Sequence, residues 1–175
     1  MAIKIIANII LIVILAIIQI SFISGLPGMA GDLNLVLAAL IFILGFSNFG
    51  FASLWAAAIG FLLEIFSFLP FGAYLFSLSA TMIIANFLLK YFFTNRSVYS
   101  FLALSGFASA ACGLAVYFFI SVFSLVNPSA EIADENFLFS MPKQICLNVL
   151  MAFIIYYIIY FFGRSFKPVF LVKKY

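Results

Sequence analysis

The stretch LNLVLAALIFILGFSNFGFASLWAAAIGFLL, residues 33–63, decides the fold. It contains no Asp, Glu, Lys or Arg. As a single helix it would be about 46 Å long, whereas the hydrocarbon core of a bilayer is about 30 Å thick. Its middle, GFSNFG at residues 45–50, consists of residues typical of turns. The stretch therefore predicts a hairpin of two spans, at about 33–46 and 51–68. The first span is short, so it should either lie under a thinned bilayer or lean on neighbouring helices.

The rest of the chain is equally apolar. Of its 175 residues 68% are hydrophobic and 7% are charged, and the mean hydropathy is +1.35. Soluble domains carry about 25% charged residues, so this chain cannot cover a water-facing surface. The 19% of aromatic residues also exclude a disordered chain. The composition predicts an all-α, polytopic membrane protein, with membrane lipids around it and no nucleic-acid partner.

We predict a single transmembrane domain over residues 1–175, a bundle of six transmembrane helices. The predicted spans are at about 5–23, 33–46, 51–68, 73–93, 98–126 and 144–162. The first span is followed by Gly28-Met29-Ala30, which resembles a signal-peptide cleavage site, but the apolar run is longer than the usual signal core of about 7–15 residues. We therefore favour a retained helix. Between the last two spans we expect a hydrophilic loop, Asn127 to Lys143, bounded by Pro128 and Pro142.

The positions of the basic residues test the hairpin. With six spans and a cytoplasmic N-terminus, seven of the eight basic residues lie on the cytoplasmic side, and only Lys143 lies outside. If residues 33–63 formed one span, only Lys4 would join Lys143 on the N-terminal side, and six basic residues would lie opposite. Because Lys and Arg favour cytoplasmic loops, the pattern predicts six spans with both termini cytoplasmic.

Glu64 is the only acidic residue in the predicted spans. An ionised carboxylate at the centre of a span costs about 2.5–3.5 kcal/mol. Glu64 lies about one turn from the external end of its span, where it is within reach of interfacial water or of the N-terminus of the helix that begins after Gly72. Two interpretations stay open: a carboxylate that caps or hydrogen-bonds within the bundle, and a site for a partner or ligand. Catalysis is disfavoured, because the spans hold no second carboxylate and the chain has no histidine.

Two spans carry small residues at helical spacing. Ala52, Ala56 and Gly60 precede Glu64 at intervals of four, and Gly106, Ala110 and Gly113 follow a similar stripe in the fifth span. Small residues let helix backbones approach closely in lipid. We expect both stripes to face protein. For the third span an internal packing seam is favoured over an interface between subunits, so a homo-oligomer stays open.

The remaining groups have simpler interpretations. Gln19, Asn86 and Asn148 are expected to hydrogen-bond between helices. Cys112 and Cys146 are interpreted as packing residues and not as a disulfide.

The chain contains no histidine, which excludes imidazole catalysis and histidine-bound metals. We therefore expect a protein that binds no cofactor and no metal and is not an enzyme. The external acidic residues and the basic tail are interpreted as a solvated face and a membrane anchor, respectively; they are Glu131, Asp134, Glu135, Arg164, Lys167, Lys173 and Lys174.

A polar turn, Gly31-Asp32-Leu33, precedes the hairpin, which ends in Gly60-Phe61-Leu62-Leu63-Glu64 and is followed by Pro70-Phe71-Gly72 and a span that ends in basic residues. In these features the segment from Asp32 to about Arg96 resembles the rod shape-determining protein MreD family. That family more often has aspartate at the position of Glu64 and proline at that of Gly31. The resemblance covers about a third of the chain, and the rest agrees in size and layout.

The resemblance implies a non-catalytic scaffold of the cell-elongation machinery in the bacterial cytoplasmic (inner) membrane. It implies an MreC-like bitopic protein as partner, other elongation-complex components, and a link to peptidoglycan synthesis. The six-helix layout is also similar to that of the substrate-binding components of energy-coupling-factor vitamin transporters. The alternative function is therefore a substrate-binding membrane component of such a transporter, although the outer halves of the spans offer few polar groups beyond Gln19, Glu64 and Ser67.

Overall fold

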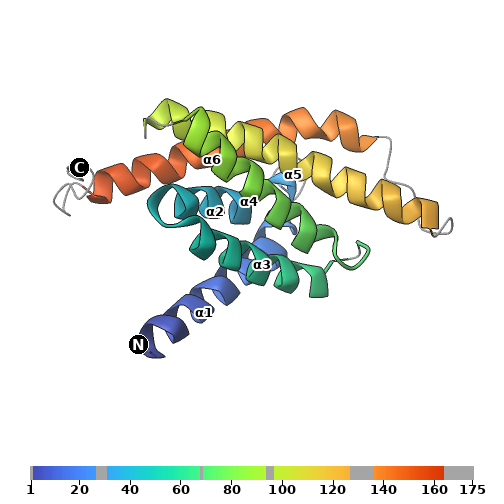
Figure 1. Ribbon diagram of the computed structural model, residues 1–175, viewed down its shortest axis with the longest axis horizontal. Coiled ribbons are helices and arrows are strands. Elements are labelled where there is room, and N and C mark those ends of the chain that lie inside the picture. The colour runs from blue at the N-terminus through green and yellow to red at the C-terminus, as the bar shows by residue number, and fades with distance from the viewer. Residues whose placement is uncertain (1, 27–30, 68, 94–96, 127–135, 164–175) are drawn as a thin grey trace.

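A computed structural model describes residues 2–26, 31–67, 69–93, 97–126 and 136–163. These residues form helices and no strand (Figure 1). The elements are α1 (Ala2–Ile17), its π-helical continuation η1 (Ile18–Ile23), α2 (Leu35–Phe46), α3 (Phe49–Ile65), α4 (Ala73–Tyr91), α5 (Val98–Val126) and α6 (Asn136–Gly163). Four stretches are long and apolar enough to cross a membrane: Ile3–Ile23, Ala73–Tyr91, Val98–Leu125 and Ser140–Phe161. The protein is therefore an all-helical membrane protein.

The predicted hairpin is present, with a tighter turn than expected. The chain reverses at Ser47 and Asn48 alone, where the Ser47 N–H closes α2 on the Ile43 carbonyl at 2.8 Å. The Asn48 backbone is extended, and its carbonyl accepts the first hydrogen bonds of α3. Gly45, a residue of the predicted turn, lies inside α2. The second helix of the hairpin also ends at Ile65 instead of 68, because the turn toward Gly72 begins at Phe66.

The last helix differs most from the prediction. α6 begins at Asn136, about eight residues before the predicted start, and continues through Pro142. Pro142 was expected to bound a loop. A proline removes only one backbone donor, and helices in membranes tolerate this loss where neighbouring groups compensate. The predicted cleavage segment, the acidic loop residues and the basic tail lie outside the described residues.

The shortest helix lies at the centre of the bundle. α2 contacts every other α-helix, and Val36, Leu37, Leu40 and Ile41 on it are almost completely inaccessible. Twelve residues span about 18 Å, which is less than the hydrocarbon thickness. α2 is therefore supported by packing against the neighbouring helices, and its N-terminus lies inside the bundle.

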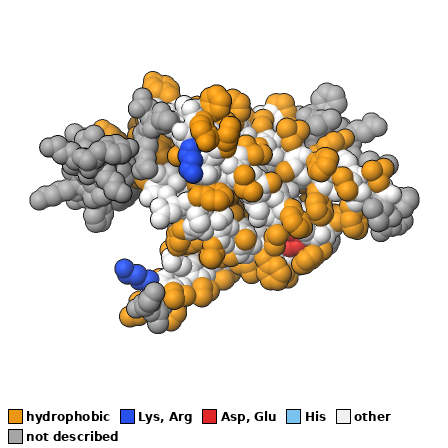
Figure 2. Space-filling view, viewed as in Figure 1, with side chains coloured by type: hydrophobic (Ala, Val, Ile, Leu, Met, Phe, Trp, Pro, Cys, Tyr) orange, Lys and Arg blue, Asp and Glu red, His pale blue; other side chains and the backbone are white. Residues whose placement is uncertain are grey.

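Aliphatic and aromatic side chains cover the outside of the molecule (Figure 2). α1 projects from the bundle (Figure 1), and Ile3, Ile5, Ile6, Ile9 and Ile10 on it are all more than half exposed. In a soluble protein such a surface would aggregate, whereas lipid chains accommodate it. The exposed surface agrees with the assignment to the membrane.

Candidate functional site

Two helices of the bundle begin at polar side chains held by other segments. We name these sites the α4 cap, which is Glu64 with the backbone N–H groups of Tyr74 and Leu75, and the α2 cap, which is Gln19, Asn34 and Asn148 with the first N–H groups of α2. The first four N–H groups of a helix have no partner within it, and in a membrane no water is available to replace them. The two caps solve the same problem with different chemistry.

In the α4 cap, Glu64 reaches from the last turn of α3 to the first turn of α4. Its Oε2 accepts hydrogen bonds from the N–H groups of Tyr74 at 3.0 Å and Leu75 at 3.1 Å. The side chain is 4% exposed, and within the described chain its Oε1 has no partner. A helix N-terminus carries about half a positive charge, which stabilises a carboxylate there. The interpretation of Glu64 as a cap of the next helix is confirmed, and one oxygen remains unused.

Two glycines allow this arrangement. A side chain at Gly60 would place its Cβ 3.0 Å from the Leu75 Cα, so α3 and α4 touch backbone to backbone one turn before Glu64. Gly72 is the N-cap of α4 and has φ = 104°, a conformation that residues with a Cβ rarely adopt. Ala52 and Ala56 continue the stripe of Gly60 and are fully buried. This stripe faces protein within the chain.

In the α2 cap, neutral amides replace the carboxylate. Gln19 Oε1 accepts from the N–H groups of Leu35 at 2.9 Å and Val36 at 3.4 Å, and its Nε2 donates to the Leu33 carbonyl at 3.0 Å. Asn34 Oδ1 accepts from the Leu37 N–H at 2.9 Å. Every early N–H group of α2 therefore has a protein partner, and none is left for a ligand.

Asn148 of α6 completes the α2 cap. Its Oδ1 accepts from the Asn34 N–H at 2.8 Å, and its Nδ2 donates to Ser109 Oγ of α5 at 2.7 Å. Ser105 Oγ donates to the Asn148 carbonyl at 3.3 Å. The amide is 1% exposed and has partners on both its oxygen and its nitrogen. Asn148 therefore joins α6 to α5 and to the start of α2, as expected of an interhelical amide.

The small residues of α5 face α6. A Cβ at Gly106 would lie 3.4 Å from Val149, and one at Gly113 would lie 2.7 Å from the flexible end of Met141. Ala110 lies between them and is half-buried. The two small-residue stripes thus pack α3 on α4 and α5 on α6.

Asn86 departs from the expectation. It lies on α4, half-buried, and forms no hydrogen bond with any residue that the structure describes. The predicted interhelical pair is therefore present for Gln19 and Asn148 and missing for Asn86.

No group of three or more potential metal ligands occurs among the described residues, and both cysteines are free. Of the buried polar side chains, Gln19, Glu64 and Asn148 bind groups of other segments, whereas the Thr81 hydroxyl donates to the Ser77 carbonyl of its own helix at 2.6 Å.

Two structural features are not among those predicted from the sequence. Asn34 is the N-cap of α2, and an asparagine directly before an apolar helical run is a recognised start signal that would have identified it. The close approach of Gly45 to Phe101 has no such signal: a Cβ at Gly45 would lie 2.5 Å from the ring, which also stacks on Phe42 at 5.3 Å. That contact joins residues far apart in the chain.

Comparison with known proteins gives no relative: no family model, curated protein or solved structure matches the chain.

Proposed function

We propose that the protein is a non-catalytic scaffold of the bacterial rod-shape machinery, located in the cytoplasmic membrane. In this proposal all six α-helices cross the bilayer, both termini are cytoplasmic, and an MreC-like bitopic protein docks on the bundle. The scaffold links that partner to peptidoglycan synthesis.

The observation that carries the proposal is the use of interior polar groups. Gln19, Asn34 and Asn148 are all engaged in hydrogen bonds that hold helices together. A ligand-binding membrane protein keeps several convergent polar groups open to its ligand. In the α2 cap these groups are closed on one another, which suits a rigid body that presents surfaces to other proteins.

The segment that resembles the MreD family also supports the proposal. Its two motifs, Gly60 to Glu64 and Pro70 to Gly72, form one unit: Glu64 caps the helix that Gly72 starts, and Gly60 brings the two backbones together. The two motifs on which the resemblance rests therefore form one structural unit in this chain.

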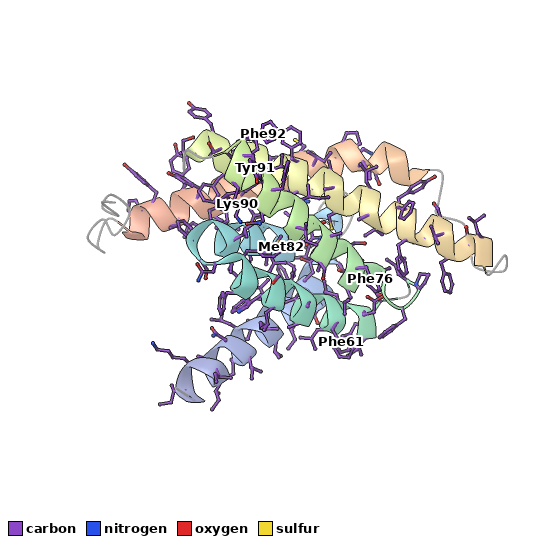
Figure 3. The ribbon with its side chains drawn as sticks, viewed as in Figure 1. Phe61, Phe76, Met82, Lys90, Tyr91 and Phe92 are labelled. Atoms are coloured by element: carbon purple, nitrogen blue, oxygen red, sulfur yellow. The ribbon has the colours of Figure 1, made fainter. Side chains whose placement is uncertain are left out.

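The arrangement of the helix ends supports the topology. In Figure 1 the start of α1, the α2–α3 turn, the end of α4 and the end of α6 lie toward one end of the bundle. The lysines visible in Figure 2 lie toward that end, and Figure 3 places Lys90 on α4 away from Phe76, which lies near its other end. A cytoplasmic location of this end agrees with the preference of lysine for that side.

Deletion of the gene in its host, with pull-down of the tagged protein from native membranes in mild detergent, tests the proposal. We expect deleted cells to become spherical and the protein to recover an MreC-like protein. Normal rod shape after deletion would overturn the scaffold. A purified protein that carries a tightly bound vitamin, or is stabilised by one on heating, would instead establish the transporter alternative.

A further inference from the structure

The flank of α4 beside α3 carries two polar side chains for which no described residue is a hydrogen-bond partner. Ser79 and Asn86 are half-buried and form no hydrogen bond within the described chain. They are seven residues apart, so they lie two turns apart on the same side of the helix. Ser79 is about 9 Å from the start of α4 at Ala73, and Asn86 is about 7.5 Å from its end at Tyr91. Both positions are within the apolar part of this span.

An amide at this depth needs a partner. An unpaired amide in an apolar medium costs several kcal/mol on hydrocarbon scales, and polar side chains of membrane helices therefore pair across helices. Gln19 and Asn148 follow this rule inside the bundle. Asn86 is the exception, and its position on the flank of α4 leaves it accessible to a helix from outside.

The surroundings of Asn86 allow such a helix to approach. Leu75 touches Gly60 of α3, and Ser79 and Asn86 follow Leu75 at helical spacing, so they lie on the side of α4 that is next to α3. On α3, Ser53 and Ala57 lie one heptad before Gly60 and Glu64 and are half-buried. The seam between α3 and α4 therefore carries half-buried small side chains of α3 on the same side as Ser79 and Asn86.

A second copy of the chain is a suitable partner at this seam, because a two-fold symmetric dimer pairs each residue with its equivalent. Membrane insertion orients all copies alike, so a two-fold axis along the membrane normal sets the two α4 helices parallel and places each residue opposite its equivalent. An amide both donates and accepts hydrogen bonds, and so does a hydroxyl. In this dimer each Ser79 lies opposite the Ser79 of the other copy, and each Asn86 lies opposite the other Asn86. A different partner protein would need two polar groups at the same spacing to pair with both residues. Lys90 follows on the same side, but it is exposed near the end of the helix, where water screens its charge.

We propose that two copies associate through parallel α4 helices, with the Asn86 amides hydrogen-bonded to each other and the Ser79 hydroxyls paired two turns away. The interface does not depend on the scaffold function, so either proposal can fail without the other.

Disulfide cross-linking tests the geometry of the interface. Ile83→Cys and Ile84→Cys are a matched pair: both side chains face outward, with 61% and 43% exposure, but only Ile83 is on the side of Ser79 and Asn86. The exposed Cys146 is first replaced by serine, whereas the buried Cys112 is kept. In oxidised vesicles we expect dimers from Ile83→Cys and not from Ile84→Cys. Equal cross-linking at both positions, or cross-linking of Ile83→Cys to a different protein in native membranes, would overturn the proposal.

Energy transfer between labelled copies in vesicles, followed through a dilution series in lipid, tests the chemistry. Asn86→Leu should weaken dimerisation about 3- to 20-fold, the range of one interhelical hydrogen bond. Asn86→Gln keeps the amide and should retain most of the association. Thermal melting of each variant in detergent checks that the bundle remains folded. A dimer that Asn86→Leu leaves unchanged, or a wild-type protein that is monomeric at all dilutions, would contradict the proposal.

Discussion

The α2 cap and the α4 cap both provide acceptors for the first backbone N–H groups of a helix, but they use different side chains. The α4 cap uses one carboxylate from a residue ten positions away in the sequence, and it leaves one oxygen unused. The α2 cap uses neutral amides that come from η1, from the cap residue itself and from α6, the last of these 114 positions away. The α4 cap therefore stabilises a local corner, whereas the α2 cap holds distant parts of the chain together.

The difference has an energetic reason. A carboxylate in a membrane costs energy unless helix N–H groups and the helix dipole compensate, so it is suited to a helix end close to the interface. A hydrogen-bonded neutral amide avoids the cost of burying a charge and also donates, so it serves at greater depth and in chains of hydrogen bonds. The central position of α2 requires the second solution.

The largest effect is expected from Gln19→Leu. Leucine removes the acceptor of two N–H groups of α2 and the donor to the Leu33 carbonyl. Each buried backbone group left without a partner costs about 1–3 kcal/mol, so the free energy of unfolding in mixed micelles should fall by about 3 kcal/mol or more.

Ser53→Ala is the control for this variant, because the hydroxyl of this half-buried residue makes only a local bond, to the Gly50 carbonyl of its own helix. Its unfolding should be nearly unchanged. Equal losses for Gln19→Leu and Ser53→Ala would show that the α2 cap does not hold the bundle together.

A second variant breaks the approach on which the α4 cap depends. Gly60→Leu places a large side chain against the backbone of Leu75, which cannot move without separating α3 from α4. We expect a loss of stability of about 1–3 kcal/mol or more and a failure of assembly in pull-down. Gly50→Leu is its control, because a Cβ at Gly50 meets open space; a similar loss in both variants would refute the importance of the close contact.

The smallest losses of stability are expected from two substitutions of Glu64. Together they separate the contribution of its charge from that of its hydrogen bonds. Glu64→Leu leaves the N–H groups of Tyr74 and Leu75 without a partner and should cost about 2 kcal/mol. Glu64→Gln keeps an acceptor and should cost about 1 kcal/mol or less, mostly the lost interaction with the helix dipole. Chemical unfolding of the two variants measures both values. If glutamine is as damaging as leucine, the charge itself holds the α4 cap.

The sequence predicted the parts of the structure that depend on neighbouring residues. The hairpin, the end of the first helix at Ile23 and the full extent of α5 follow from hydrophobicity and turn residues. The reach of Glu64 to the helix after Gly72 is also local. Pro142 departs from the prediction because a proline removes only one backbone donor, and α6 continues through it from Asn136 to Gly163.

Hydrogen bonds between residues far apart in the sequence could not be predicted from hydrophobicity and turn residues. Asn148 was expected to bond between helices, but nothing in its neighbours indicates Asn34 and Ser109 as its partners. Likewise, the pattern around Asn86 is no different from that around Asn148, although one amide is satisfied and the other is not. Whether an amide finds a partner depends on how helices distant in sequence are placed, and one sequence does not encode that placement in any local pattern.

The bond between Asn34 and Asn148 also constrains biosynthesis. A ribosome that adds about 5–20 residues per second needs about 6–23 s to make the 114 residues between them. During that interval the Asn34 N–H at the start of α2 lacks the acceptor that it has in the folded protein. Only the arrival of the final helix supplies that acceptor, so a chain that stops before residue 148 cannot complete the start of α2.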